Sequence, residues 1–189
     1  MIATDKKLLR SELRCKSLAM SFDDRKAEAQ RVVTLVERVL AEREAGVLAM
    51  FYPLADEIDI LPLAERAAAM GWRVVMPRMA SGEELQMEFY DFIEKQMAEG
   101  KMGVIEPQAK EPIEVEAIDL MIVPGVAFTA DGARLGRGKG YYDRYMARSG
   151  FRAYTVGVGY AHQILTALPQ EAHDRRVDMV IGGKDVEKE

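Results

Sequence analysis

Short apolar runs alternate with helical patterns along the chain after residue 45. Six runs rich in β-branched and aromatic residues predict strands: GVLAMFY (46–52), WRVVMP (72–77), LQMEFYDF (85–92), DLMIVPGV (119–126), YTVGVGY (154–160) and VDMVIGG (177–183). Several are almost continuously apolar, which is typical of strands covered on both faces. The pattern predicts an α/β fold, a Rossmann-like three-layer α/β/α sandwich with a mostly parallel central sheet.

Helix signals lie between these runs. Ser21, followed by Asp24, resembles a variant capping box and opens a helix that we expect over residues 22–44. Apolar residues then recur at helical spacing, at Val32, Val36, Val39 and Leu40. Two further helices are expected, one from Asp59 and Pro62 to Gly71, and one from Tyr141 to Arg148 before Gly150.

One segment breaks this alternation. Residues 94–117 mix charges, glycines and two prolines, which predicts a surface connection. Too few residues follow it for an obvious second core, so it is not read as a domain boundary. We expect residues 1–189 to form a single domain, with 184–189 as a solvated tail.

Composition narrows the class of protein. A chain of 189 residues that is 49% hydrophobic can bury a stable core without disulfides or metals. The single cysteine, Cys15, has no partner for an internal disulfide, which fits a reducing cytoplasm. The N-terminus carries charges every few residues, and the apolar runs are about strand length, so neither secretion nor membrane insertion is expected. With a net charge of -5, the chain offers no general attraction to nucleic acid or anionic lipid. We expect a cytoplasmic protein, a monomer, whose partner is a small molecule.

Positive charge nevertheless gathers in the stretch RLGRGKGYYDRY, residues 134–145. Five cations and only one anion, Asp143, lie between Arg134 and Arg148. The cations are Arg134, Arg137, Lys139, Arg144 and Arg148. Glycines at 136, 138 and 140 allow positive φ angles and bring the backbone amides close to a ligand. The stretch follows a predicted strand and precedes a predicted helix, where open α/β sheets bind phosphate.

Common phosphate motifs do not match this stretch. A Walker A loop needs glycine where Ala133 stands and Ser or Thr where Gly140 stands, and Tyr141 or Asp143 replaces the third glycine of a dinucleotide fingerprint. The residues alone therefore leave two interpretations, an unclassified phosphate cradle or a mobile cationic surface loop.

The N-terminal segment carries a second set of cations. Lys6, Arg10 and Arg14 recur every four residues and would stack on one helical face, while Leu9 and Leu13 point elsewhere. A bound anion would relieve their repulsion, but a solvated stripe explains the spacing equally well.

Together these segments resemble the 5-formyltetrahydrofolate cyclo-ligase family, also called methenyltetrahydrofolate synthetases. The resemblance rests on VPGVAFTADGARLGRGKGYYDRYMAR at 123–148, with KKLLR (6–10), MFYPLADEIDI (50–60), MPRM (76–79), GVIEP (103–107) and LPQEAHDRRVD (168–178) in the same order. The segment RLGRGKGYYD is the specific part. One departure is Thr129, where the family usually has aspartate; Asp131 lies two positions later.

The resemblance implies an ATP- and Mg²⁺-dependent enzyme that converts 5-formyltetrahydrofolate into 5,10-methenyltetrahydrofolate, releasing ADP and phosphate. Phosphoryl transfer to the formyl oxygen, followed by attack of N10, is the implied route. Such a transfer depends on positioning and charge neutralisation, so the lack of a Ser-His-Asp or Cys-His set is no obstacle.

Site residues carry over from the family by position. The implied nucleotide contacts are Lys6, Arg10, Arg134, Leu135, Gly136, Arg137, Gly138, Lys139, Gly140, Tyr141 and Tyr142. The implied substrate contacts are Arg10, Tyr52, Glu57, Arg137, Gly138, Lys139, Gly140 and Tyr141. Lys139 and Arg137 are the implied catalytic residues, Lys139 being the first choice for the γ-phosphate, and Asp143 and Asp174 are the implied magnesium ligands. Arg14 stays unassigned.

Alternatives remain for single residues and for the whole chain. Asp143 alone could be a carboxylate stabilised by the first turn of a helix, and Asp174 a loop acid paired with Arg175 or Arg176. Glu57, for which we hypothesise hydrogen bonds to pterin N–H groups, could be a solvated charge. His173 is expected to be a loop histidine and not a general base. Met50, Met76, Met79 and Met87 could contact a pterin or belong to the core. The rival functions are a non-catalytic folate- or nucleotide-binding protein and a nucleic-acid module.

Overall fold

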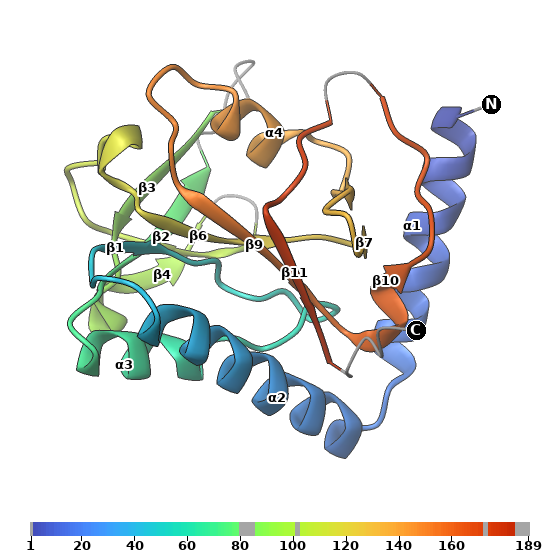
Figure 1. The fold of residues 1–189 in the computed structure, drawn as a ribbon, viewed down its shortest axis with the longest axis horizontal. Coiled ribbons are helices and arrows are strands. Elements are labelled where there is room, and N and C mark those ends of the chain that lie inside the picture. The colour runs from blue at the N-terminus through green and yellow to red at the C-terminus, as the bar shows by residue number, and fades with distance from the viewer. Residues whose placement is uncertain (1, 80–85, 101–102, 172–173, 184–189) are drawn as a thin grey trace.

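The computed structural model describes residues 2–79, 86–100, 103–171 and 174–183 (Figure 1). Within them, a six-stranded sheet has the order β11-β9-β6-β1-β2-β3. Its strands are β1 (Val47–Ala49), β2 (Arg73–Met79), β3 (Met87–Asp91), β6 (Leu120–Pro124), β9 (Tyr154–Gly159) and β11 (Met179–Gly182). All neighbouring pairs are parallel except β2 with β3. The predicted α/β fold with a mostly parallel central sheet is confirmed.

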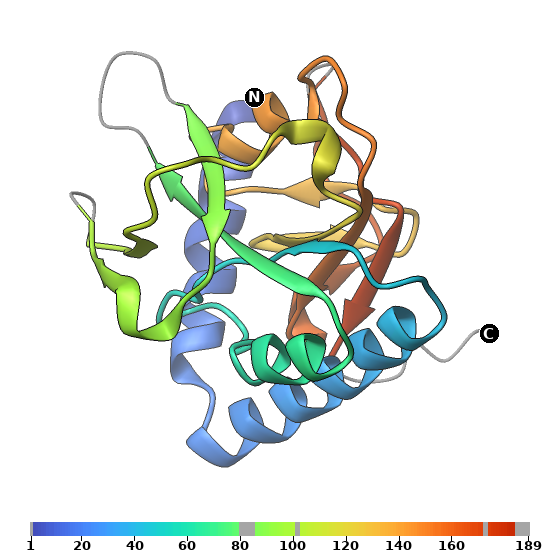
Figure 2. The ribbon, with the colours of Figure 1, turned by 90° about the vertical axis from the view of Figure 1, so that its left-hand side faces the viewer.

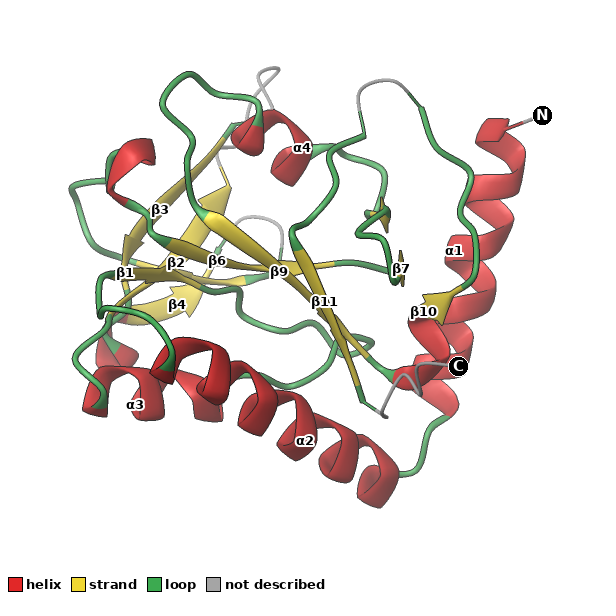
Figure 3. Cartoon of the chain, viewed as in Figure 1, coloured by secondary structure: helices red, strands yellow, loops and turns green. Residues whose placement is uncertain are grey.

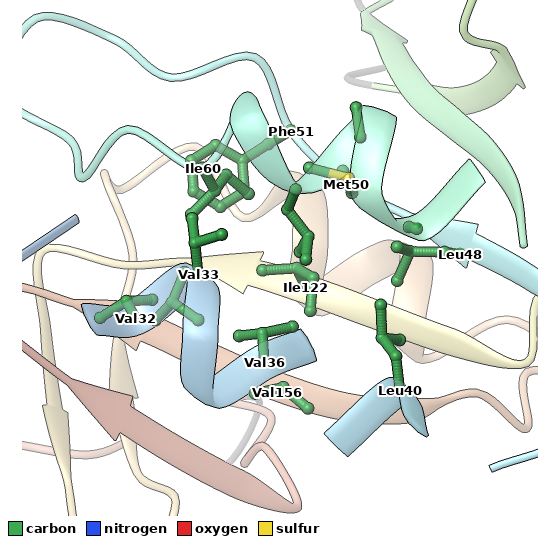
Figure 4. Packing of buried hydrophobic residues seen from close by; sticks show 14 of the residues in the cluster. Val32, Val33, Val36, Leu40, Leu48, Met50, Phe51, Ile60, Ile122 and Val156 are labelled. Carbon is green, nitrogen blue, oxygen red and sulfur yellow. The ribbon is translucent and has the colours of Figure 1, made fainter. Parts of the chain in front are cut away.

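Two helices cover one face of the sheet. They are α2 (Phe22–Ala41) and α3 (Pro62–Ala69), and both lie along the lower side of the sheet in Figures 1 and 2. Ser21 caps α2 by accepting a hydrogen bond from Asp24 N, as its sequence position predicts. Val36 of α2 points toward Ile122 and Val156 of the sheet (Figure 4). This face forms the larger apolar core.

The other face has a thinner cover. It consists of α4 (Tyr141–Met146) and the loops around it. Tyr145 of α4 packs edge-on against Phe89 of β3, with ring centroids 5.0 Å apart. The glycine-rich stretch before α4 lies beside the carboxyl ends of β2 and β6, with which it lines a cleft.

Helix α1 (Ile2–Ala19) stands at the side of the sandwich, beside a second, small sheet (Figure 3). This sheet pairs β10 (Ile164–Leu165), β7 (Ala127–Thr129) and β8 (Arg134–Leu135) in that order. Leu13 of α1 packs with Val126 and Leu135 in a separate apolar cluster. The strand predicted over 119–126 therefore ends at Pro124, and the chain turns at Gly125 into the small sheet.

The family departure at Thr129 has a local explanation. Its hydroxyl donates a hydrogen bond to Asp131 and accepts one from Ala133 N at 3.1 Å. Thr129 therefore closes the turn that leads from β7 into β8.

The segment 94–117 is more ordered than predicted. It holds η1 (Glu94–Gln96), the antiparallel pair β4 (Met97–Glu99) and β5 (Ile105–Pro107), and η2 (Val115–Ala117). Ile113 is buried and bridges to Phe89 of β3. Most of the described residues in this segment are at least partly exposed, as predicted for a surface connection, but Ile113 joins the core, and Val104 and Ile105 line a cleft.

Other boundaries differ only slightly from those predicted. Helix α2 ends at Ala41 and not at 44, and α4 ends at Met146. A short turn, η3 (Ala161–Gln163), follows β9. His173 and the tail 184–189 lie outside the described residues. None of the described helices is both long and apolar enough to cross a bilayer.

Candidate functional site

A mainly apolar cleft opens beside the carboxyl ends of β1, β2 and β6. It encloses about 710 Å³ of empty space, counting space open to solvent. Its apolar wall is formed by Phe51, Tyr52, Leu54, Pro77, Met79, Val104, Ile105, Pro124 and Tyr141. Glu57, Arg134, Arg137, Lys139 and Asp143 supply the charges. We call this the first cleft.

A second, more polar cleft lies along the glycine-rich stretch. It is lined by Gly138, Lys139, Gly140, Asp143, Arg144, Ala147 and Arg175. Three cationic side chains thus stand against one carboxylate. Lys139, Gly140 and Asp143 line both clefts, so the clefts adjoin at these residues, and we call the shared glycine-rich segment, residues 138–143, the wall.

The backbone of this wall depends on glycine. Gly138 and Gly140 have φ angles of 100° and 65°, which side chains with a Cβ rarely adopt. Arg144 Nη2 donates to Lys139 O at 2.7 Å and ties the loop to α4. The Lys139 ammonium itself has no hydrogen-bond or ion-pair partner among the described residues, so it is available to a ligand.

Helix α1 reaches the site with three cations on one face, as their spacing predicts. Lys6 Nζ lies 2.6 Å from Asp174 Oδ2 and 2.7 Å from Glu171 Oε2. Arg10 Nε donates to Gly136 O at 2.7 Å. Each cation therefore contacts a different loop of the site. Arg14 contacts the loop that contains Asp56, as described below.

The Lys6 side chain is almost fully buried. Burial lowers the pKa of its ammonium, but the hydrogen bonds and negative charges of Asp174 and Glu171 outweigh that effect and raise the pKa overall. Lys6 is therefore charged at neutral pH.

The two aspartates predicted as metal ligands lie near one another. Asp143 Oδ1 pairs with Arg134 Nη2 at 2.8 Å and also accepts a hydrogen bond from Arg175 N, the residue after Asp174, at 3.1 Å. Asp174 Oδ2 accepts a hydrogen bond from Glu171 N in addition to that from Lys6. Each carboxylate is thus held by a cation that was itself predicted to contact nucleotide.

Glu57 and Arg137 form an ion pair in the first cleft. Glu57 Oε1 accepts from Arg137 Nε at 2.7 Å, and Oε2 accepts from Leu54 N at 2.9 Å. The Glu57 side chain is buried, so the alternative of a solvated charge does not hold. A pterin would share this carboxylate with protein donors.

Asp56, which the sequence did not single out, is the second partner of Arg137. Its Oδ1 lies 2.7 Å from Arg137 Nη2, and its Oδ2 lies 2.8 Å from Arg14 Nε. Burial raises the pKa of the Asp56 carboxyl, but the hydrogen bonds from Arg137 and Arg14 outweigh it and lower the pKa below its ordinary value. The only available signal was its place beside Glu57 in the stretch ADE.

Several other residues have clear positions. The Leu135 side chain packs against Leu13 in the core and lines neither cleft. Met79 lines the first cleft, whereas Met50, Met76 and Met87 are core residues. The Tyr142 hydroxyl is buried without a hydrogen-bond partner among the described residues, and burial raises its pKa. Arg175, which was not predicted as a site residue, faces the second cleft.

The site of this α/β protein is thus a glycine-rich loop shared by an apolar cleft and a more cationic one. Residues 2–183 match the model of the 5-formyltetrahydrofolate cyclo-ligase family. The chain belongs to this family, and it is an enzyme.

Relatives of known name agree with this assignment. The chain is 26% identical to 5-formyltetrahydrofolate cyclo-ligase of Mus musculus, with 93% of this chain and 92% of the relative covered. It is 30% identical to the 5-formyltetrahydrofolate cyclo-ligase of Escherichia coli K12, with 81% of this chain and 84% of the relative covered. Among solved structures, the 5,10-methenyltetrahydrofolate synthetase of Aquifex aeolicus superposes with a TM-score of 0.82 at 29% identity, covering 95% of this chain and 90% of the other.

Proposed function

We propose that the protein uses ATP to close 5-formyltetrahydrofolate into 5,10-methenyltetrahydrofolate, releasing ADP and phosphate. Family membership and the names of the relatives support the overall activity. The two clefts support the need for two substrates, a flat folate in the first cleft and a polyphosphate in the second.

The chemical difficulty is the formyl amide. Its carbonyl carbon is a poor electrophile and its oxygen a poor leaving group, so N10 cannot close the ring unaided. We propose that the γ-phosphoryl group of ATP is transferred to the formyl oxygen, giving an iminium phosphate at N5. N10 then attacks the formyl carbon and gives up its proton, the C–O bond breaks, and the oxygen leaves as phosphate, which carries that proton away.

The shared wall is the observation that carries this proposal. Lys139, Gly140 and Asp143 line both clefts, so the clefts adjoin there, and a terminal phosphate at the edge of the second cleft would lie beside a formyl oxygen at the edge of the first. Transfer between two bound groups requires this proximity. The Lys139 ammonium would neutralise charge on the transferred group, and it can follow that group because its stem is flexible.

Asp143 and Asp174 are the proposed magnesium ligands. Carboxylate oxygens suit this ion, which commonly takes one or two of them beside phosphate oxygens and water. The described residues contain no group of three or more potential metal ligands, so phosphate and water would have to complete the coordination. When bound, magnesium would neutralise phosphate charge, while Lys6 and Arg134, released from these aspartates, would turn to the nucleotide.

The first cleft is the proposed folate site. Its aromatic and aliphatic wall suits a pterin ring, and Tyr52, Glu57 and Arg137 supply polar groups at its edge. We further propose that the enzyme works as a monomer in the cytoplasm, which the lone, exposed Cys15 supports.

An absorbance assay for methenyltetrahydrofolate tests the function directly. Product should form from 5-formyltetrahydrofolate only when ATP and Mg²⁺ are both present, with one ADP released per product. Product formation without ATP, or binding of both ligands with no turnover, would refute the proposal, and the second result would favour a non-catalytic binding protein. Asp143→Asn should lose most of the turnover while keeping the fold, as judged by circular dichroism.

A further inference from the structure

Four side chains of alternating charge connect helix α1 to the first cleft. Arg14 of α1 holds Asp56, Asp56 holds Arg137, and Arg137 holds Glu57, with donor–acceptor distances of 2.8, 2.7 and 2.7 Å. Only Arg137 and Glu57 line the cleft. Asp56 and Arg14 therefore stand behind the two residues that a ligand would meet.

Asp56 is placed to orient Arg137. The guanidinium is held at Nε by Glu57 and at Nη2 by Asp56, so its plane is fixed by two acceptors. Among the described residues, Nη1 has no partner, which leaves it as the nitrogen available to a ligand. Without Asp56, one acceptor remains, and the guanidinium can rotate about its bond to Glu57.

Arg14 stabilises Asp56 from the outside. The Asp56 side chain is 6% exposed, whereas that of Arg14 is 53% exposed. A buried carboxylate is costly unless both oxygens are paired, and Arg14 pairs the oxygen that Arg137 leaves free. The position of α1 thus affects the first cleft, because Arg14 of α1 pairs with the carboxylate that holds Arg137.

The backbone of the loop around Asp56 is fixed by other contacts. Arg25 of α2 donates to Ala55 O at 2.5 Å, and the Tyr160 hydroxyl donates to Glu57 O at 3.1 Å. These contacts do not involve the Asp56 side chain. Replacing its charge should therefore release Arg137 without displacing the loop.

We infer that Asp56 is a positioning residue of the first cleft, which holds Arg137 against Glu57 and is itself held by Arg14. The inference rests on the proposed function, because it takes the first cleft as the folate site. It concerns binding in that cleft alone, because Arg137, although carried over from the family as a nucleotide contact as well, does not line the second cleft.

Asp56→Asn tests the inference, because the amide keeps the shape of the side chain and removes its charge. We expect the KM for 5-formyltetrahydrofolate to rise about tenfold, with the KM for ATP unchanged. Calorimetric titration with 5-formyltetrahydrofolate alone should show the same loss of affinity. Arg14→Met should shift the folate KM in the same direction by about threefold, Arg14→Lys should restore part of it, and the double variant should resemble Asp56→Asn alone.

Lys16→Met is the matched control. Lys16 lies on the same helix and pairs with Glu12 at 2.7 Å on an exposed face, away from the loop. Its folate KM should match that of the wild type.

The outcomes separate this inference from the proposed function. A wild type without turnover refutes the function, whereas an active wild type beside an Asp56→Asn variant with unchanged folate affinity refutes only the inference. Equal loss of affinity for ATP and folate would also refute it, since that indicates general damage. If Asp56→Asn does not fold, the two Arg14 variants decide. Arg14→Met should raise the KM for folate and not that for ATP, and Arg14→Lys should restore part of the loss; an unchanged folate KM in Arg14→Met would refute the inference.

Discussion

The Lys6 ammonium and the Asp174 carboxylate lie 2.6 Å apart, so a predicted nucleotide contact and a predicted metal ligand neutralise one another. Arg134 and Asp143 form a second such pair at 2.8 Å. These four side chains are therefore paired before any ligand arrives, whereas the Lys139 ammonium has no partner among the described residues. Binding of a metal–nucleotide complex would exchange partners, with carboxylates turning to the cation and cations to phosphate, and would create few new unpaired charges.

Replacing Lys6 should reveal how much its buried positive charge contributes to stability. Lys6→Met removes a buried cation from between Asp174 and Glu171, so we expect the free energy of unfolding to fall by about 3 kcal/mol. Urea denaturation measures this value. Lys16→Met removes an exposed pair from the same helix and should cost at most about 0.5 kcal/mol. An equal fall in the free energy of unfolding for the two variants would mean that the burial of Lys6 adds nothing to the stability its ion pairs provide.

Lys139 should affect turnover more than stability. Its ammonium has no partner among the described residues, so Lys139→Ala should leave the melting temperature unchanged. We expect kcat to fall about 100-fold or more, because charge neutralisation on the transferred group is lost. Lys95→Ala, at an exposed lysine of η1, serves as the control and should be neutral. A normal rate for Lys139→Ala would remove it from the mechanism.

Arg175 and its neighbour Arg176 offer a paired comparison. Arg175 lines the second cleft, whereas Arg176 pairs with Asp131 on the surface. Arg175→Ala should raise the KM for ATP about tenfold, since one cation facing the phosphates is lost. Arg176→Ala should leave that KM unchanged. Steady-state kinetics at varied ATP concentration measure both values. The same KM for ATP in the two variants would contradict a role for Arg175 in binding the phosphates.

Glycine in the wall should matter for activity beyond its effect on the fold. Gly138 and Gly71 have similar φ angles, 100° and 88°, and an added Cβ would meet only ordinary contacts at either position. Alanine at each should therefore cost about 1 kcal/mol of stability. Only Gly138→Ala should also lower kcat/KM, by about tenfold, because it moves the amides beside Lys139. Similar kinetics in the two variants would argue against a role for the wall.

Stability at acid pH should report on Asp56. The pKa of this carboxyl is 3.8 in its ordinary state and lower in the folded protein. A lowered pKa gives stability that is fully present above pH 3.8 and is lost as the pH falls through the folded value. The difference in unfolding free energy between wild type and Asp56→Asn should therefore be constant near neutral pH and shrink below pH 3.8. If the difference in unfolding free energy grew as the pH fell, the pKa of Asp56 would be raised and not lowered in the folded protein, which would contradict its ion pairs with Arg137 and Arg14.

Local patterns predicted most of the fold correctly. The apolar runs that became β2, β6 and β9 are long enough to show their periodicity, and Ser21 marks the start of α2 by its own hydrogen bond. The small sheet escaped notice because β8 and β10 have two residues each, too few for any periodicity. The order in 94–117 was missed because it depends on a tertiary contact, the bridge from Ile113 to Phe89.

The candidate site was only partly visible for the same reason. The glycine-rich stretch is continuous in sequence, so its composition alone indicated a special loop. Asp56 became a candidate only when folding brought together Arg14, 42 positions away, and Arg137, 81 positions away. Likewise, the spacing of Lys6 and Arg10 predicted a shared helical face but could not say which loops that face would meet.

The residues that the two clefts share have a practical consequence for inhibitor design. Since Lys139, Gly140 and Asp143 are common to both, a compound joining a flat heterocycle to a polyphosphate mimic through a short tether would straddle the wall. Such a bisubstrate ligand would gain from the high effective concentration of its second half once the first is seated. The shared residues on which the proposed function depends are thus also a point of attack for selective inhibitors.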